Sequence, residues 1–236
     1  MRRVALVALV ALAGCGGGKG DHGAVTVAAA SSLTGALTEC GGSAKLEFGG
    51  SDDLAAQIRQ GVGIDVFAAA NMALPQQLAE DGDVQAPVAF ATNRLVLAVP
   101  RDSSIASIDQ LASAALVVGS ASVPVGAYTR QVLARLPAAR RHAIEGAIRS
   151  EEPDVKSIVG KLVTGAADAG FVYASDVMAT DELRAVALPD GLQPTVVYGI
   201  SIVRDSEAAK AFVDSVLHGA CASALRKAGF GAPPVG

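Results

Sequence analysis

Short apolar segments and longer amphipathic segments alternate along the chain from residue 24 onward. The apolar segments have the length of strands, and the amphipathic ones repeat apolar residues at helical spacing. Strands are predicted at residues 25–30, 44–48, 64–69, 95–99, 115–118, 169–173, 183–188 and 195–203. Helices are predicted at residues 32–39, 51–60, 75–80, 107–111, 127–136, 154–164 and 206–230, the last with a break at Gly219. This alternation predicts an α/β fold with largely parallel sheets.

Two of the apolar strands, 95–99 and 197–203, are placed where they can carry the chain from one lobe to another and back. A chain of 236 residues is long enough for one large domain or for two small lobes. Ligands in open α/β folds bind beyond the carboxyl ends of the strands, where helix N-termini converge. We therefore expect a binding site at those strand ends.

The first residues have the pattern of an export signal. Arg2 and Arg3 supply a positive start, an apolar stretch follows at 4–12, and Leu-Ala-Gly-Cys then ends at Cys15. The apolar stretch is too short for a permanent membrane helix, and the whole pattern is typical of a signal peptide. Its last four residues resemble a bacterial lipobox, which implies cleavage before Cys15 and lipid on that cysteine. The alternative is an ordinary secreted protein with an incidental cysteine.

We therefore expect residues 1–14 to be removed as a signal peptide and the glycine-rich residues 15–23 to form a lipidated tether. Loss of Arg2 and Arg3 with the signal peptide moves the formal charge from −4 to −6. This acidic balance, without a basic cluster, argues against nucleic acid as a partner. Hydrophobic residues make up 51% of the chain and aromatic residues only 4%, so alanine and valine fill most of the core.

Two cysteines, Cys40 and Cys221, remain after Cys15. An exported protein meets an oxidising environment, in which such a pair can form a disulfide. The alternative is two buried thiols that stay unpaired, as cysteines in a core often do. Metal binding needs more ligands than these two cysteines, and the three histidines form no cluster with them.

Two turns led by serine carry the candidate chemistry. Ser31 and Ser32 follow the first predicted strand, and Ser51 follows the second. Each turn precedes a helix, so a hydroxyl group meets several unpaired backbone N–H groups, an arrangement that favours an anion. Because no histidine, lysine or arginine stands beside these serines, we interpret them as hydrogen-bond donors and not as nucleophiles. Taken alone, Ser51 is equally typical of a helix N-cap.

Seven segments, in order along the chain, resemble the molybdate-binding proteins of bacterial molybdate ABC transporters. They are Ala28–Thr34, Gly49–Ile58, Asp65–Asn71, Ser122–Tyr128, Asp154–Lys156, Gly165–Asp176 and Lys227–Phe230. The resemblance implies a two-lobed periplasmic-binding-protein fold of type II. Each lobe is then a mixed sheet flanked by helices, and the ligand lies in the cleft between the lobes. Residues 24–96 and 203–236 would form lobe 1, and residues 97–202 would form lobe 2.

The resemblance also implies the contacts to the ligand. Carried over position by position, these are the hydroxyl groups of Ser32, Ser51 and Tyr173 and the backbone at Val125 and Val155. Ser31 stays an alternative to Ser32 because this turn has two serines. A tetrahedral dianion has acceptor oxygens only, and serine, tyrosine and amide groups can all donate to them. No cofactor, and no metal apart from the oxyanion itself, is implied.

The implied function is the binding of molybdate and tungstate outside the cytoplasm, for delivery to the membrane permease of an ABC importer. The protein would be a monomeric lipoprotein facing the periplasm or cell exterior, and not an enzyme. One alternative is the same fold with another ligand, such as sulfate, phosphate or a small organic acid, although no arginine stands in the motifs to clamp a carboxylate. The other is a serine hydrolase or phosphatase. That reading lacks a Gly-x-Ser-x-Gly elbow, and His22, His142 and His218 lie outside every motif.

One segment departs from the pattern of the relatives. The first helix and its following turn, residues 36–43, are shorter than is usual in that family. A bridge between Cys40 and Cys221 would compensate by holding the shortened segment against the C-terminal helices, which is a hypothesis at this point.

Overall fold

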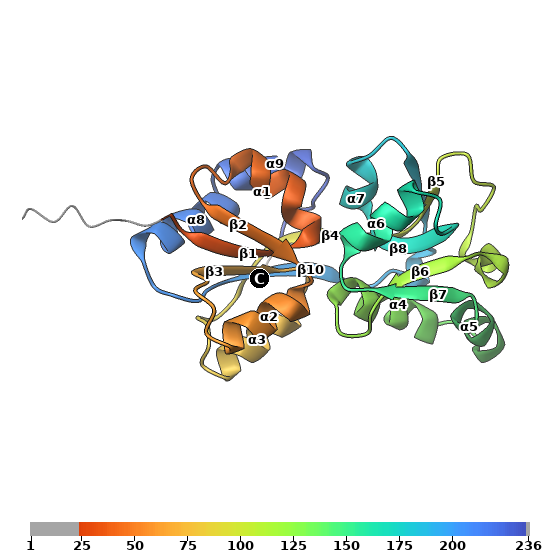
Figure 1. The fold of residues 1–236 in the computed structure, drawn as a ribbon, viewed down its shortest axis with the longest axis horizontal. Coiled ribbons are helices and arrows are strands. Elements are labelled where there is room, and N and C mark those ends of the chain that lie inside the picture. Colours follow the sequence, from red (N-terminus) through yellow and green to blue (C-terminus); the bar gives the residue numbers. More distant parts are fainter. Residues whose placement is uncertain (1–23, 235–236) are drawn as a thin grey trace, which may run out of the picture.

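The computed structural model describes residues 24–234, so the predicted signal peptide, Cys15 and the tether lie outside the described residues. Two five-stranded sheets form two lobes joined by strands that pass between them (Figure 1). The strand order is β2-β1-β3-β10-β4 in the first sheet and β7-β6-β8-β5-β9 in the second. Over residues 24–234, none of the helices combines the length and the apolar character needed to span a bilayer.

The first lobe places helices on both faces of its sheet. Its strands are β1 (Thr26–Ala30), β2 (Lys45–Gly49), β3 (Val66–Ala69), β4 (Val88–Asn93) and β10 (Val196–Ile202). Helices α1 (Thr34–Cys40), α8 (Glu207–Leu217) and α9 (Ala220–Lys227) cover one face, and α2 (Ser51–Arg59) and α3 (Ala73–Glu80) cover the other (Figure 1). A 3₁₀ turn, η1 (Ser31–Leu33), joins β1 to α1. Strands β1 and β3 are apolar and almost fully buried, as expected of strands covered on both sides.

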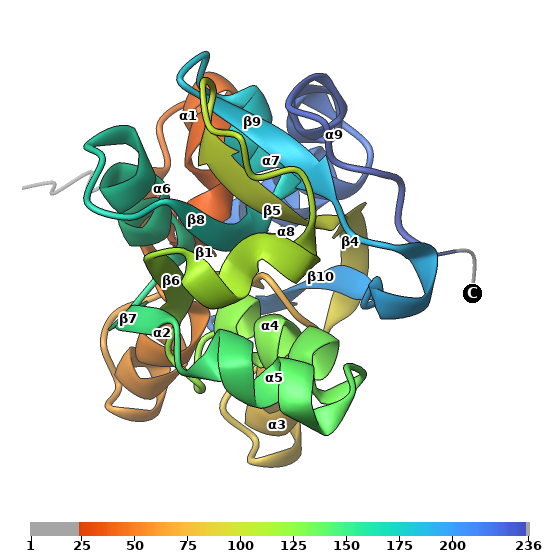
Figure 2. The same ribbon diagram turned by 90° about the vertical axis from the view of Figure 1, so that its right-hand side faces the viewer.

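The second lobe has the same plan. Its strands are β5 (Leu95–Pro100), β6 (Leu116–Gly119), β7 (Ile148–Glu152), β8 (Ala169–Tyr173) and β9 (Leu183–Ala187). Its helices are α4 (Pro124–Ala134), α5 (Ala138–Glu145), α6 (Val155–Val163) and α7 (Ala174–Met178), with the 3₁₀ turns η2 (Ile108–Ser113) and η3 (Asp190–Leu192). Figure 2 shows α4 and α5 on one side of this sheet and α6 and α7 on the other.

The apolar pattern did not predict β4, α5, β7 or the short helix α7. Strand β7 carries an arginine and two glutamates in five residues, and helix α5 buries only Ile144. Such edge and surface elements bury too little apolar surface to leave a clear period in the sequence.

Both sheets are mixed, which confirms the fold class and corrects the expectation of largely parallel sheets. β1 pairs in parallel with β2 and β3, and β6 pairs in parallel with β7 and β8. In contrast, β10 is antiparallel to β3 and β4, and β5 is antiparallel to β8 and β9. The parallel strands of each sheet end at the cleft. A strand that enters the sheet from the other lobe begins at the cleft, so it is antiparallel to them. β10 does this in the first lobe and β5 does it in the second.

The predicted lobe boundaries are displaced in the structure. The chain passes from the first sheet to the second between Asn93 and Leu95. Residues 196–202, predicted in lobe 2, form β10 and pair within the first sheet. An apolar strand beside a point where the chain passes between the lobes can join either sheet, and its composition does not indicate which sheet it joins.

Buried apolar residues form one core that continues through both lobes and a smaller cluster under α2 and α3. Alanines contribute much of the surface that the sheets present, for example Ala28 and Ala29 in β1, which are fully buried. Small side chains of this kind let the helices pack closely on the strands and set their first turns near the strand ends.

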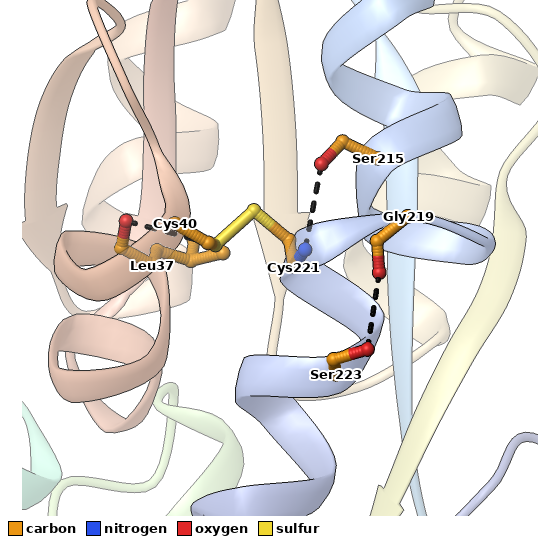
Figure 3. The surroundings of a disulfide bond; sticks show 6 residues. All are labelled: Leu37, Cys40, Ser215, Gly219, Cys221 and Ser223. Carbon is orange, nitrogen blue, oxygen red and sulfur yellow. Dashed lines mark hydrogen bonds between the residues drawn. A yellow bond between two sulfur atoms is a disulfide. The ribbon is translucent and has the colours of Figure 1, made fainter.

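A disulfide joins Cys40, the last residue of α1, to Cys221 in α9 (Figure 3). The backbone N–H of Cys221 also donates to the Ser215 hydroxyl of α8 at 3.4 Å. The short first helix is thus fastened to the C-terminal helix pair, which is the arrangement proposed above for the shortened segment. Of the two alternatives for these cysteines, the structure has the bridge.

Candidate functional site

The six parallel-paired strands all end at the gap between the lobes, and a small cavity lies there. Its volume is about 20 Å³, far below the roughly 300–1,000 Å³ of pockets for drug-sized organic ligands. The first lobe lines it with Ala30, Ser31, Ser32, Gly49, Gly50, Ser51 and Ala70. The second lobe lines it with Val123, Pro124, Val125, Asp154, Val155 and Tyr173. A cavity of this size suits a small inorganic ion.

The structure brings together all the residues that the resemblance selected. Ser31, Ser32 and Ser51 come from one lobe, and Val125, Val155 and Tyr173 come from the other. Their places follow from the fold, because each stands at, or a few residues after, the carboxyl end of a parallel strand. Their role as ligand contacts stays a prediction.

Three helices begin at this cavity: α2 at Ser51, α4 at Pro124 and α6 at Val155. The first N–H groups of a helix have no partner inside it, and the positive end of the helix dipole lies there. Pro124 has no N–H to offer, so Val125 supplies the first donor of α4. The lining residues include no lysine, arginine or histidine. The positive potential in the cavity therefore comes from backbone dipoles.

Asp154 is the acidic residue that lines the cavity, and its carboxylate accepts hydrogen bonds from the first turn of α6. One carboxylate oxygen accepts from the Ser157 N–H at 3.0 Å, and the other accepts from the Ser157 hydroxyl at 3.2 Å. This is an N-cap interaction. The carboxylate orients the first turn of α6, which includes the N–H of Val155.

Ser51 is 2% exposed, and its Oγ accepts a hydrogen bond from the backbone N–H of Ala70 at 3.1 Å. A serine hydroxyl has a single hydrogen to donate. Since its oxygen is already engaged as an acceptor, that hydrogen is available to a ligand in the cavity. The contact with Ala70 thus defines Ser51 as a donor.

Tyr173 is 1% exposed, and its hydroxyl has no hydrogen-bond partner among the described residues. Burial, followed by the proximity of Tyr198, Tyr128 and Asp176, raises the pKa of Tyr173 well above its usual value. The phenol therefore keeps its proton at physiological pH and can donate it to a ligand. An unpaired buried group of this kind costs about 1–3 kcal/mol, which a ligand oxygen would offset.

Ser32 differs from Ser51 in its partner. Its Oγ lies 2.9 Å from the hydroxyl oxygen of Tyr198, a fully buried residue of β10. Ser31 also lines the cavity, and its carbonyl accepts from the Thr34 hydroxyl at 2.7 Å. Both serines remain candidates for a ligand contact.

An ion pair lies behind the second-lobe part of the cavity. Lys156 Nζ lies 3.2 Å from Oδ1 of the buried Asp176, and the other carboxylate oxygen, Oδ2, accepts from the Tyr173 N–H at 3.3 Å. Burial raises the pKa of Asp176, and the Lys156 ammonium opposes that shift. Because Lys156 follows Val155 directly, the pair ties the start of α6 to the end of β8.

At Gly50 the two lobes approach each other closely. A Cβ added there would overlap the carbonyl oxygen of Pro153 across the cleft, and it would lie 2.9 Å from Asp52 Oδ1 in its own lobe and 3.4 Å from a Val123 methyl group. The backbone of Gly50 has φ −62° and ψ 134°, which any residue can adopt. Glycine is therefore required at this position for space across the cleft and not for its conformational freedom.

The sequence analysis missed Gly50 and Tyr198 as functional candidates. Gly50 lies inside a quoted segment, but its neighbour across the cleft comes from a distant part of the chain. Tyr198 lies in an apolar strand, and the available signal was that the chain has only three tyrosines.

The hydrolase alternative gains no support from the cavity. His142 belongs to α5 and His218 follows α8, and neither lines the cavity, while His22 lies outside the described residues. Within residues 24–234, no group of three or more His, Cys, Asp or Glu side chains is arranged to hold a metal ion. Of the two histidines that the structure describes, neither is placed beside the serines as a general base.

Comparison with known proteins found a matching family and several relatives. The family described as bacterial extracellular solute-binding protein matches residues 25–231. The molybdate-binding protein ModA of Mycobacterium tuberculosis (strain H37Rv) is 33% identical over 227 residues, which cover 89% of this chain and 85% of that protein.

Two solved structures share the fold. The periplasmic molybdate-binding protein of Azotobacter vinelandii matches with a TM-score of 0.76 and 18% identity, over 89% of this chain and 100% of that one. The sulfate-binding protein SubI of Mycobacterium tuberculosis matches with a TM-score of 0.74 and 15% identity, over 89% of this chain and 86% of that one. The fold therefore serves oxyanions of more than one kind, and the ligand has to be inferred from the cavity.

Proposed function

The chain belongs to the bacterial extracellular solute-binding protein family, and on this basis we propose that it captures molybdate or tungstate for an ABC importer. The observation that carries the proposal is the composition of the cavity. It offers hydroxyl groups and helix N-termini from both lobes, and one of those hydroxyls, on Tyr173, is buried without a partner among the described residues.

A site made of donors favours a fully deprotonated oxyanion. Molybdate, tungstate and sulfate have only acceptor oxygens near neutral pH, whereas phosphate retains at least one proton, which needs an acceptor. Hydrogen bonds to a charged group are stronger than neutral ones. Discrimination against sulfate would come from size, because the donors are fixed at the ends of three helices and contact a larger anion better.

The proposed mechanism is closure of the lobes on the anion. Ser32 and Ser51 on one side and Val125, Val155 and Tyr173 on the other can contact one small ion together only when the lobes are shut. A ligand that makes its full set of contacts in the closed state shifts the population toward that state. The closed protein would then be presented to the membrane permease.

The proposal includes export and a lipid anchor at Cys15. Membership of a family of extracellular proteins supports export. The anchor is supported by the leader and its lipobox-like ending. A single chain contributes both halves of the cavity, so the site requires no second copy of the protein.

We expect the purified protein to bind sodium molybdate and sodium tungstate far more tightly than sodium sulfate or sodium phosphate in calorimetric titrations. For phosphate, a proton that faces donors adds a penalty of about 3 kcal/mol, or roughly a hundredfold in affinity. Tighter binding of sulfate than of molybdate would contradict the proposed ligand and favour the sulfate alternative.

We expect Tyr173→Phe to weaken molybdate binding by roughly thirtyfold, because a hydrogen bond to a charged ligand contributes about 2 kcal/mol. The unliganded variant should be no less stable to heat than the wild type, since this hydroxyl has no protein partner to lose among the described residues. Calorimetry measures the first effect and a melting curve without ligand measures the second.

Ser51→Ala provides the contrast. It should weaken binding similarly, but it should also lower the stability of the unliganded protein by about 1 kcal/mol, because the Ala70 N–H loses its acceptor. Unchanged affinity in both variants would show that the site has been assigned to the wrong residues.

A further inference from the structure

The Tyr198 hydroxyl is hydrogen-bonded to Ser32, a residue that lines the cavity. Its hydroxyl oxygen lies 2.9 Å from Ser32 Oγ, and neither distance nor burial decides which oxygen donates. Tyr198 itself is fully buried and does not line the cavity. The direction of this one hydrogen bond determines whether the Ser32 hydrogen points at Tyr198 or remains available to a ligand.

The surroundings favour donation by the tyrosine. Burial, followed by the negative charge of Asp176, raises the pKa of Tyr198 well above its usual value, while Ser32 and Asn93 act in the opposite direction. The phenol therefore keeps its proton at neutral pH. A phenol is also more acidic than an alcohol, so it is the better donor of the two and serine is the better acceptor.

Asn93 supplies a second reason. Its side-chain oxygen already accepts from the Arg94 N–H at 2.9 Å, and its amide nitrogen donates to Ser175 Oγ at 2.8 Å. Asn93 also lowers the pKa of Tyr198, which is the effect of a donor group near the phenol oxygen. A phenol oxygen that faces a donor leaves the phenol hydrogen free for Ser32.

We propose that Tyr198 is a positioning residue, which donates to Ser32 Oγ and thereby turns the Ser32 hydrogen toward the bound oxyanion. The inference rests on the proposed function of the site. It gives Ser32 the arrangement that the Ala70 N–H gives Ser51: a protein donor occupies the serine oxygen, and the hydroxyl hydrogen goes to the ligand. Both serines then act as donors only, which matches an anion that cannot donate in return.

Through Tyr198, Ser32 is connected to the strands at which the chain passes from one lobe to the other. Asn93 ends β4 and Tyr198 lies in β10, the two strands of the first sheet that adjoin the second lobe. The Tyr198 ring also packs edge-on against Tyr173, with 5.8 Å between ring centroids. Tyr198 thus contacts a proposed ligand residue of each lobe.

The test is a double-mutant cycle with Tyr198→Phe and Ser32→Ala, read by calorimetric titration with sodium molybdate. Removing one neutral hydrogen bond that orients the donor should weaken binding about fivefold to tenfold in Tyr198→Phe. In the Ser32→Ala background the same change should have almost no further effect, because the group that it orients is gone. If the Tyr198 hydroxyl had only a structural role, Tyr198→Phe would weaken molybdate binding by the same factor in the Ser32→Ala background as in the wild type.

Tyr128→Phe is the matched control. Tyr128 is a buried tyrosine of α4 whose ring also packs against Tyr173, but its hydroxyl is near the Val197 backbone and it does not line the cavity. Its affinity for molybdate should equal that of the wild type. Wild-type affinity in Tyr198→Phe, or additive effects in the cycle, would overturn the inference.

The outcomes separate this inference from the proposed function. If the wild type binds sulfate and not molybdate, the proposed ligand is wrong, and the same cycle read with sodium sulfate still decides the role of Tyr198. If the wild type binds neither anion, both the function and the positioning role are overturned.

Discussion

Replacing Gly50 with alanine is expected to abolish tight molybdate binding while leaving the fold intact. The added methyl group would overlap the Pro153 carbonyl oxygen across the cleft, and a backbone oxygen cannot rotate away as a side chain can. The second-lobe donors at Val125, Val155 and Tyr173 would then fail to reach an anion held by the first lobe. Three contacts of at least about 1.5 kcal/mol each correspond to more than a thousandfold in affinity.

The fold itself should tolerate this change. The backbone angles of Gly50 suit alanine, and within its own lobe the added methyl group meets only the side chain of Asp52, which can rotate away. Calorimetry measures the loss of binding, a melting curve measures stability, and small-angle scattering with excess molybdate should show that the variant does not become more compact.

Gly160→Ala is the matched control for Gly50→Ala. Gly160 lies in α6, and no atom lies within 4 Å of the place where its Cβ would be, apart from the helix's own nearby backbone. This variant should bind as the wild type does. Wild-type affinity in Gly50→Ala would show that binding does not need the close approach of the lobes at this position.

Removing the disulfide is expected to lower the free energy of unfolding by about 3 kcal/mol, since a bridge that closes a long loop restricts the unfolded chain strongly. The two cysteines are separated by 181 residues, so the loop includes most of the residues that the structure describes. Urea unfolding of the Cys40→Ala/Cys221→Ala variant measures the loss. Molybdate affinity should change little, because Cys40 lies at the opposite end of α1 from Ser31 and Ser32.

Wild-type protein treated with a reductant provides the control for the cysteine variant. Both should unfold at the same, lower urea concentration, whereas reductant should have no effect on the variant. Equal stability of the variant and the untreated wild type would show that the C-terminal helices hold α1 in place without the bridge.

Much of the site could be predicted because it is built from local signals. Ser51 follows a strand and begins a helix, and Tyr173 ends a strand, so the fold class alone takes both to the cleft. The order of the family-like segments supplied the rest, including the two valines, whose side chains are not the groups proposed to bind. These residues share a position at or shortly after a strand end, and the hydrophobic pattern of the sequence predicts strand ends well.

The features that the sequence did not reveal depend on contacts between distant segments. Ser32 and Tyr198 are 166 residues apart, and the strand that contains Tyr198 is apolar throughout its neighbourhood. Gly50 matters because of Pro153 in the other lobe. The direction of β10 in its sheet likewise follows from where the chain re-enters the first lobe. The hydrophobic period within a short segment gives no information about such contacts between distant segments.

The cluster of aromatic rings at the cleft has a practical consequence for spectroscopy. The chain has no tryptophan, and its three tyrosines are Tyr128, Tyr173 and Tyr198. All three are buried where the lobes meet, with neighbouring ring centroids 6.5 and 5.8 Å apart. The intrinsic ultraviolet emission of the protein therefore originates at the cleft, so that the proposed closure can be tested by tyrosine fluorescence without an attached dye.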